Sequence, residues 1–156
     1  MRKTVSKKDK GFSLVELIIV IAIMAILIGV LAPQYLKYVE KSHVTADKDI
    51  LETVCRACAT ASADDDITDL PRAGDTNITV DPAGCHAGWS KRVLELCGVS
   101  DFERDVEGRL QSKVARGQKI KIEVNDGNQF TVYVGTKTNV DSNKNGIVVG
   151  FDADNT

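Results

Sequence analysis

The chain, 156 residues long, has few of the side chains from which active sites are built. It has two histidines, His43 and His86, and neither has an evident nucleophile as a partner. The sequence has no glycine-rich phosphate-binding loop, and its carboxylates are scattered. We therefore expect no enzymatic activity. Internal repeats and low-complexity tracts are also absent. With 43% hydrophobic residues, the sequence suits one modest domain with an appendage.

Basic residues are concentrated at the N-terminus. Residues 1–11 hold five of the 20 lysines and arginines against one acid, so this leader has a net charge of +4. Because the whole chain has a net charge of −2, the remainder has a net charge of −6. Binding to nucleic-acid phosphates needs clustered Lys and Arg, so we expect no specific nucleic-acid partner for this acidic body.

No Lys, Arg or His lies between Gly11 and Lys37. The 21-residue span from Phe12 to Ala32 is apolar apart from one serine and Glu16. As a helix it would rise about 31 Å, close to the thickness of the hydrocarbon core of a bilayer. The basic leader predicts an N-in, C-out orientation. No small-x-small cleavage pattern ends the span, which argues against an ordinary secretory signal peptide.

Glu16 is the one charged residue of this span, and a carboxylate at membrane depth costs at least a few kcal/mol. If the chain is cut after Gly11, Phe12 acquires an α-amino group that could pair with Glu16 of a neighbouring copy. Side-by-side apolar helices would bury both charges together, and Glu16 would also lie near the positive end of its own helix dipole. The alternative is a carboxylate that reaches the headgroups from the first turn.

The stretch "KGFSLVELIIVIAIMAIL", with its basic leader, Gly11, Phe12 and Glu16, closely resembles the type III signal of type IV pilins and pseudopilins. The resemblance covers about residues 7–40. It implies cleavage after Gly11 by a membrane aspartyl prepilin peptidase and N-methylation of Phe12. It also implies that Glu16 neutralises the N-terminal amine of a neighbouring subunit during assembly.

The function implied by this resemblance is that of a structural subunit. It would polymerise through its N-terminal helix into an extracellular type IV pilus for adhesion, motility or surface attachment. Its partners would be further copies of the chain, the prepilin peptidase and the pilus assembly machinery. Before assembly, the precursor would span the inner (cytoplasmic) membrane once. One alternative is a pseudopilin of a type II-like secretion or DNA-uptake apparatus. Another is a membrane-tethered redox or metal-binding protein.

Pro33 lies just past the apolar span. It lacks an amide donor, and its ring opposes the carbonyl of Gly29, so residues 29–33 form a weak helical turn. Filaments of the family commonly melt the helix near such a proline, which makes Gly29 to Pro33 a candidate extensible segment; a simple kink is the alternative. Beyond it, apolar residues spaced by three and four predict one stripe of an amphipathic helix ending near residue 62. They are Val39, His43, Ala46, Ile50, Val54, Ala57 and Ala61.

The rest of the chain predicts a small mixed domain. "WSKRVLELCG" reads as a short helix stopped by Gly98, and "SDFERDVEGRL" as another with a Ser100/Glu103 capping pair. From residue 118 the apolar period changes to two, over "IKIEV", "QFTVYVG" and "GIVVGF", which predicts three short antiparallel strands. The expected fold class is α+β, a long N-terminal helix packed on a small antiparallel sheet, as in pilins.

The expected organisation follows from these segments. Residues 1–11 are the cleaved leader, and residues 12–36 are the transmembrane and filament-core helix. Residues 37–156 form the head. Within the head, residues 37–62 form the amphipathic helix, residues 63–117 the connecting region and residues 118–156 the sheet.

Four cysteines, Cys55, Cys58, Cys85 and Cys97, lie in the exported part, where an even count favours disulfides. Cys55 and Cys58 are three residues apart on the predicted helix, a poor fit for bonding each other. We favour bridges from these two to Cys85 and Cys97, with 55–58 plus 85–97 as the alternative. The "CRAC" motif also permits a redox or zinc reading with His86 as a spare ligand. However, the strand-to-helix setting of a redox CxxC is absent.

A calcium-loop spacing occurs in "DSNKNGIVVGFD". Its candidate ligands are Asp141, Asn143, Asn145, the backbone carbonyl of Ile147 and Asp152 as residue twelve. Aspartate replaces the usual final glutamate, and the loop leads into a strand instead of a helix. The alternative is a tight hairpin turn at Asn145-Gly146. Calcium is the one cofactor that the sequence suggests.

Overall fold

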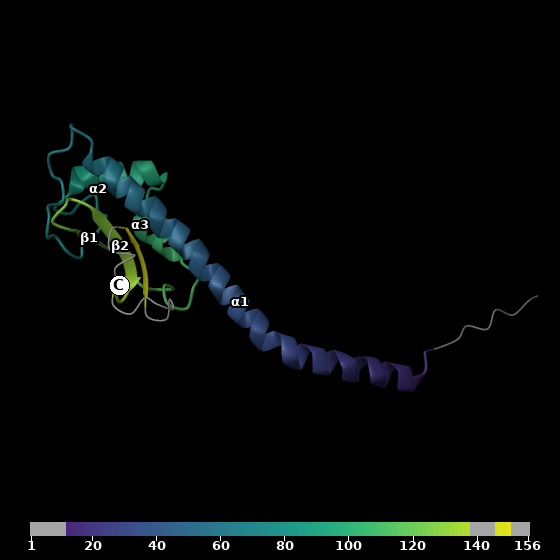
Figure 1. The fold of residues 1–156 in the computed structure, drawn as a ribbon. Helices are drawn as coiled ribbons and strands as arrows, with labels where there is room; N and C mark the ends of the chain where they lie inside the picture. The colour runs from purple at the N-terminus through teal and green to yellow at the C-terminus, as the bar shows by residue number, and fades with distance from the viewer. Residues whose placement is uncertain (1–11, 138–145, 151–156) are drawn as a thin grey trace, which may run out of the picture. The chain divides into compact units, whose positions relative to one another are not determined.

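A computed structural model of the chain describes residues 12–137 and 146–150. Its elements are α1 (Leu14–Ser62), α2 (Ala87–Cys97), α3 (Phe102–Asp105), a 3₁₀ turn η1 (Glu107–Arg109), and the strands β1 (Lys121–Val124), β2 (Phe130–Gly135) and β3 (Gly146–Gly150) (Figure 1). A long helix with a small antiparallel sheet confirms the α+β prediction. The chain divides into two compact units, Met1–Tyr38 and Val39–Thr156.

The described part of the first unit, residues 12–38, is one stretch of helix from Leu14 onward. The helix α1 begins at Leu14, directly after Ser13, and holds Glu16 in its first turn. It runs without a break through Gly29 and Pro33. The large apolar side chains from Leu14 to Leu31 are each between 51% and 72% exposed, on every side of the helix. A helix that is apolar all round needs an apolar environment, which water does not supply.

In the second unit, α1 buries a row of side chains that differs from the predicted stripe. Val54, Ala57 and Ala61 are buried as predicted, whereas Ala46 is exposed, and His43 and Val39 are half-buried. The remaining buried positions are Val44, Asp47, Leu51 and Cys58. The stripe is therefore rotated toward Asp47, whose carboxylate is satisfied by backbone amides after η1. Sequence periodicity alone assigns such a residue to the solvent.

The two short helices follow the predicted positions with one correction. Gly98 ends α2 in the left-handed region (φ 68°), and its N–H donates to the carbonyl of Glu95, as a C-terminal stop does. The residue that caps α3 is Asp101 instead of Ser100, because the Asp101 carboxylate accepts the N–H of Arg104 at 2.9 Å. The large apolar side chains of this segment, Phe102, Val106 and Leu110, are buried.

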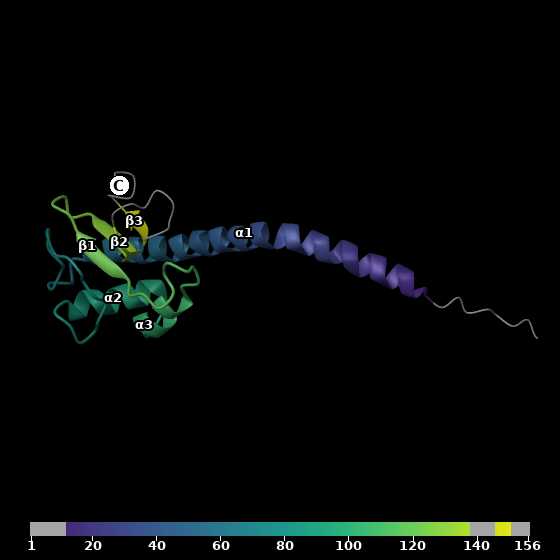
Figure 2. The same ribbon diagram turned by 90° about the horizontal axis from the view of Figure 1, so that it is seen from below.

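The sheet has the order β1-β2-β3 with both pairs antiparallel. Ile122 lies opposite Val132, and Val134 lies opposite Ile147, so alternate side chains form one buried face. Figure 2 shows the strands on one side of α1, and α2 and α3 on the other. Trp89 of α2 joins the layers, stacking on Phe130 of β2 with ring centroids 5.9 Å apart.

Candidate assembly site

The first turn of α1 holds the carboxylate on which the assembly prediction depends. Ser13 immediately precedes the helix, and its carbonyl accepts the N–H of Leu17 at 3.2 Å. Glu16 reaches back, and its carboxylate accepts the N–H of Ser13 at 2.9 Å. This is the glutamate half of a capping box. The carboxylate therefore has a backbone partner within its own chain, which sequence reasoning did not identify.

Phe12 and Glu16, four residues apart in the sequence, lie at the start of an uncovered apolar surface. Phe12 is 92% exposed. Gly11, the other residue of the predicted cleavage site, lies outside the described residues. Within the described chain, α1 is the one helix long and apolar enough to cross a membrane, and the most apolar part of it is not buried inside the protein. Any partner that covers this surface would enclose Glu16 together with it.

The turn at residues 29–33, predicted to be weak, is helical in the structure of the single chain. Gly29 and Pro33 both lie inside α1, and a Cβ placed on Gly29 would meet no atom within 4 Å. Pro33 withholds one amide from the helix, so this turn has one hydrogen bond fewer than its neighbours. Melting of Gly29 to Pro33 in a filament stays a prediction.

The four cysteines are thiols in the structure, and they differ in their surroundings. Cys58 is fully buried beside the core residue Trp89, whose indole N–H points to the Cys58 carbonyl at 3.4 Å. Cys55 is half-buried, with its Sγ 3.5 Å from the carbonyl oxygen of Phe130. Cys97, at the end of α2, lines a hollow with Ile50, Thr53 and Val54 of α1. Cys85 is exposed.

These surroundings bear on the pairing of the cysteines. α2 spans 11 residues between Cys85 and Cys97, a rise of about 16 Å, whereas a disulfide needs Cα atoms within about 7 Å. A bridge between Cys85 and Cys97 would therefore require α2 to unwind. Cys97 instead lines a hollow with Val54 of α1, and Cys58 lies four residues after Val54 on the same side of that helix.

The thiols have little of the character that redox catalysis needs. Burial raises the pKa of the Cys58 thiol well above its ordinary value, and the neighbouring Cys55 and Cys97 raise it further. Burial also raises the pKa of Cys55 and of Cys97. A reactive cysteine has a lowered pKa, because the thiolate is the nucleophile. Within residues 12–137 and 146–150, no group of three or more His, Cys, Asp or Glu side chains is arranged to hold a metal ion.

The candidate calcium loop is described only in part. Asp141, Asn143, Asn145 and Asp152 lie outside the described residues. Ile147 is fully buried in β3, opposite Val134. Gly146 is already the first residue of β3 and pairs with Gly135, so a two-residue turn at Asn145-Gly146 is wrong. A Cβ at Gly146 would collide with the carbonyl oxygen of Thr136, which explains the glycine by close backbone approach.

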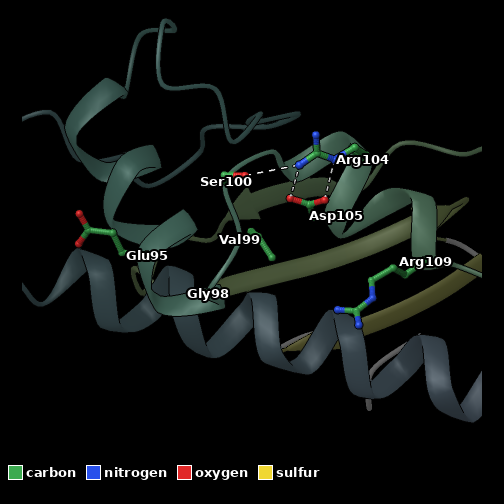
Figure 3. A pocket seen from close by; sticks show the side chains of 7 residues that line it. All are labelled: Glu95, Gly98, Val99, Ser100, Arg104, Asp105 and Arg109. Carbon is green, nitrogen blue, oxygen red and sulfur yellow. Dashed lines mark hydrogen bonds and ion pairs between the residues drawn. The ribbon is translucent and has the colours of Figure 1, made fainter.

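A hollow of about 640 Å³ opens between α2 and α3 (Figure 3). Its lining is Glu95, Gly98, Val99, Ser100, Arg104, Asp105 and Arg109. The Arg104 guanidinium donates to both carboxylate oxygens of Asp105, at 2.8 and 3.0 Å, and this bonding lowers the pKa of Asp105 to about 2. Of the charged residues in this lining, Arg104 and Asp105 thus pair with each other, and Glu95 pairs with Arg92 outside it at 3.0 Å. No nucleophile with a base beside it is among the lining residues.

Asp69 is a second structural carboxylate that the sequence did not reveal. It accepts the N–H of Gly88 at 2.7 Å and of Trp89 at 3.3 Å, and so caps α2 from a loop 19 residues earlier. The carbonyl of the same residue accepts from Nδ1 of His86 at 2.8 Å. A Cβ on Gly88 would lie 2.7 Å from the Asp69 carboxylate, so this contact needs glycine.

Comparison with known proteins bears on the first unit. Residues 6–32 match the family model described as the prokaryotic N-terminal methylation motif. No curated protein and no solved structure matches the chain. The matched range contains the apolar helix, Phe12, and Glu16 in its capped first turn. The chain therefore carries the type IV prepilin-like signal at its N-terminus, the mark of a pilin-like or pseudopilin-like precursor.

Proposed function

We propose that the chain is a structural subunit that polymerises through the N-terminal part of α1 into an extracellular type IV pilus. One observation carries the proposal. The methylation motif coincides with a helix whose apolar side chains are exposed on every side and whose first turn holds Glu16. Outside lipid this surface would cost about 25 cal/mol per Å² in water, so burying it against further copies is what lets the helix leave the membrane.

The charge pattern gives the orientation of the precursor, and the resemblance to prepilins implies the steps that follow. The basic leader, residues 1–11, retains the N-terminus at the cytoplasmic face, and the head is exported. A prepilin peptidase cuts after Gly11 and leaves Phe12 with a free amine that is then methylated. The assembly machinery moves the apolar helix from lipid into the filament core. Glu16 of one copy accepts the amine of the next.

Electron microscopy of cells with and without the chain tests the proposal. Long surface filaments that disappear on deletion, and that react with an antibody to residues 39–156, are the expected result. A processed chain that stays in the cell envelope without such filaments would instead indicate a pseudopilin of a secretion or DNA-uptake apparatus.

Mass spectrometry of the assembled protein tests the processing step. The mature chain should lack eleven residues and carry one added methyl group on Phe12. Filaments that contain the intact leader would overturn this step. Gly11→Ala, which changes the cleavage residue and nothing in the described helix, should leave an uncut precursor in the membrane.

A further inference from the structure

Within residues 12–38, the described part of the first unit, the aromatic side chains lie only at the two ends. Phe12 is at the start, and Tyr35 and Tyr38 follow the apolar span. Every large apolar side chain between these ends is aliphatic. The tyrosines are 66% and 74% exposed, and Lys37, the first cation after Gly11, lies between them and is also exposed. The helix thus carries a polar-tipped segment directly after its purely aliphatic part.

Tyrosine, with an apolar ring and a polar hydroxyl, is enriched where lipid tails meet headgroups. Lysine can lay its carbon chain along apolar surface and place its ammonium group among phosphates. We propose that Tyr35, Lys37 and Tyr38 form a belt that binds the headgroup boundary of the outer leaflet and sets the depth of α1. The inference rests on the proposed membrane stage before assembly.

The belt fixes the position of Glu16. Nineteen residues separate Glu16 from Tyr35, a rise of about 28 Å along a helix. This is close to the hydrocarbon thickness of about 30 Å. With the tyrosines at the outer boundary, Glu16 reaches the inner boundary, where headgroups and water are accessible. Together with the N–H of Ser13, these surroundings give the carboxylate polar partners before a neighbouring subunit reaches it.

The proposed belt is tested by measuring how deep two positions of α1 lie in a bilayer. The full-length chain is reconstituted in phosphatidylethanolamine–phosphatidylglycerol vesicles that contain lipids brominated at known acyl positions. Tyr35→Trp places a fluorophore at the proposed boundary, and Leu27→Trp places one about 12 Å deeper. The native Trp89 is fully buried in the head and provides a background that lipid bromines do not reach.

The expected result is that bromines nearest the headgroups quench position 35 most, and bromines near the acyl ends quench position 27 most. Strongest quenching of position 35 by deep bromines, or none by any, would overturn the belt. If neither position is quenched, the chain does not enter the bilayer, and the proposed membrane stage fails with it. If deep bromines quench position 27 most but headgroup-proximal bromines do not quench position 35 most, the belt is overturned and the membrane stage stands.

A second reporter tests whether these side chains hold the depth. Leu31→Trp lies about 6 Å inside the proposed boundary. Adding Tyr35→Ala and Tyr38→Ala should shift its strongest quenching to deeper bromines, because the helix loses its polar-tipped rings. Leu36→Ala is the control, since Leu36 is as exposed as Tyr35 but has no polar tip. An equal shift in the control, or no shift in the double variant, would mean that depth is set by apolar length alone.

Discussion

The carboxylate of Asp47 in α1 accepts the backbone N–H of Ser112 at 2.9 Å, across 65 positions of the chain. Its other oxygen accepts the N–H of Gln111 at the same distance, and Glu40 accepts the N–H of Lys113 at 2.7 Å. Three successive amides are thus held by two carboxylates of one helix. These contacts hold the segment between η1 and β1 to α1, together with the burial of its side chains Leu110, Ala115 and Ile120 in the core.

Replacing Asp47 should destabilise the head. Asp47 is fully buried, so Asp47→Ala leaves the amides of Gln111 and Ser112 without acceptors, at a cost of about 2–5 kcal/mol. Asp47→Asn retains one acceptor and should lose less. Denaturant unfolding followed by Trp89 fluorescence measures the difference. Asp49→Ala, at an exposed position of the same turn, should unfold like the parent. If Asp47→Ala destabilised the head no more than Asp49→Ala does, water would be replacing the carboxylate as the acceptor for the two amides.

Asp69 should make the stability of the head fall in acid. The N–H groups of Gly88 and Trp89 lower the pKa of this carboxyl below its ordinary value near 3.8. The folded state therefore binds the proton less readily than the unfolded state. The contribution is fully present above about pH 4 and is lost as pH falls through the lowered folded-state pKa.

Melting temperatures between about pH 6 and pH 2.5 measure this contribution. Asp69→Asn should flatten the acid side of the profile, since its amide does not titrate there. It should also lower stability at neutral pH, because its one carbonyl oxygen can replace only one of the two carboxylate oxygens that accept from Gly88 and Trp89. Gly88→Ala should lower stability at neutral pH, because its Cβ displaces the Asp69 carboxylate. A parental acid profile in Asp69→Asn would assign the loss to other carboxyls, of which Asp105, held by Arg104, is the first candidate.

If the head is exported as proposed, it should contain a bridge between Cys58 and Cys97. Cys97 ends α2 against the face of α1 that carries Cys58, and α2 holds Cys85 too far from Cys97. An exported thiol oxidase would remove two electrons and two protons from the pair. The bridge should stabilise the head by about 2–4 kcal/mol. Mass mapping without reductant should recover the peptides of Cys58 and Cys97 linked, and Cys97→Ser should remove the link. Four alkylatable thiols in the exported protein would contradict the pairing.

What the sequence could predict was local. Alternation at Ile122 and Val124 predicted β1, and Gly98 predicted the end of α2, because each signal depends on residues a few positions away. The motif around Glu16 predicted the prepilin-like signal for the same reason. Its capping bond to Ser13 fits a three-residue spacing that sequence reasoning could also have found.

What the sequence could not predict depends on distant partners. Asp47 is buried because amides 64 and 65 positions away meet it, and α2 is capped by Asp69 from another loop. Periodicity assigns a charged residue to the solvent unless its partners are known. For α3, two adjacent residues, Ser100 and Asp101, both suit a helix start, and the extended backbone of Asp101 decides between them.

Calcium binding at Asp141, Asn143, Asn145 and Asp152 remains a prediction. If these oxygens bind the ion, calcium should raise the melting temperature of the head in the detergent-solubilised chain, because a ligand of the folded state stabilises it. Asp141→Ala should abolish the increase. Asp126→Ala, at an exposed turn between β1 and β2, is the matched control and should retain it. No increase at about millimolar calcium would leave "DSNKNG" as a connection between strands.

The last prediction separates the two partners of Glu16. Glutamine serves at the third position of a capping box as glutamate does, so Glu16→Gln should preserve the bond to Ser13, membrane insertion and processing. It cannot neutralise the amine of Phe12 from a neighbouring copy, and an unpaired buried charge costs several kcal/mol per subunit. Filament yield should therefore collapse as in Glu16→Ala, while the processed membrane pool persists. Glu52→Gln, which removes a carboxylate from an exposed pair with Arg56, should assemble normally. Normal filaments from Glu16→Gln but not from Glu16→Ala would show that assembly needs the hydrogen bond and not the charge.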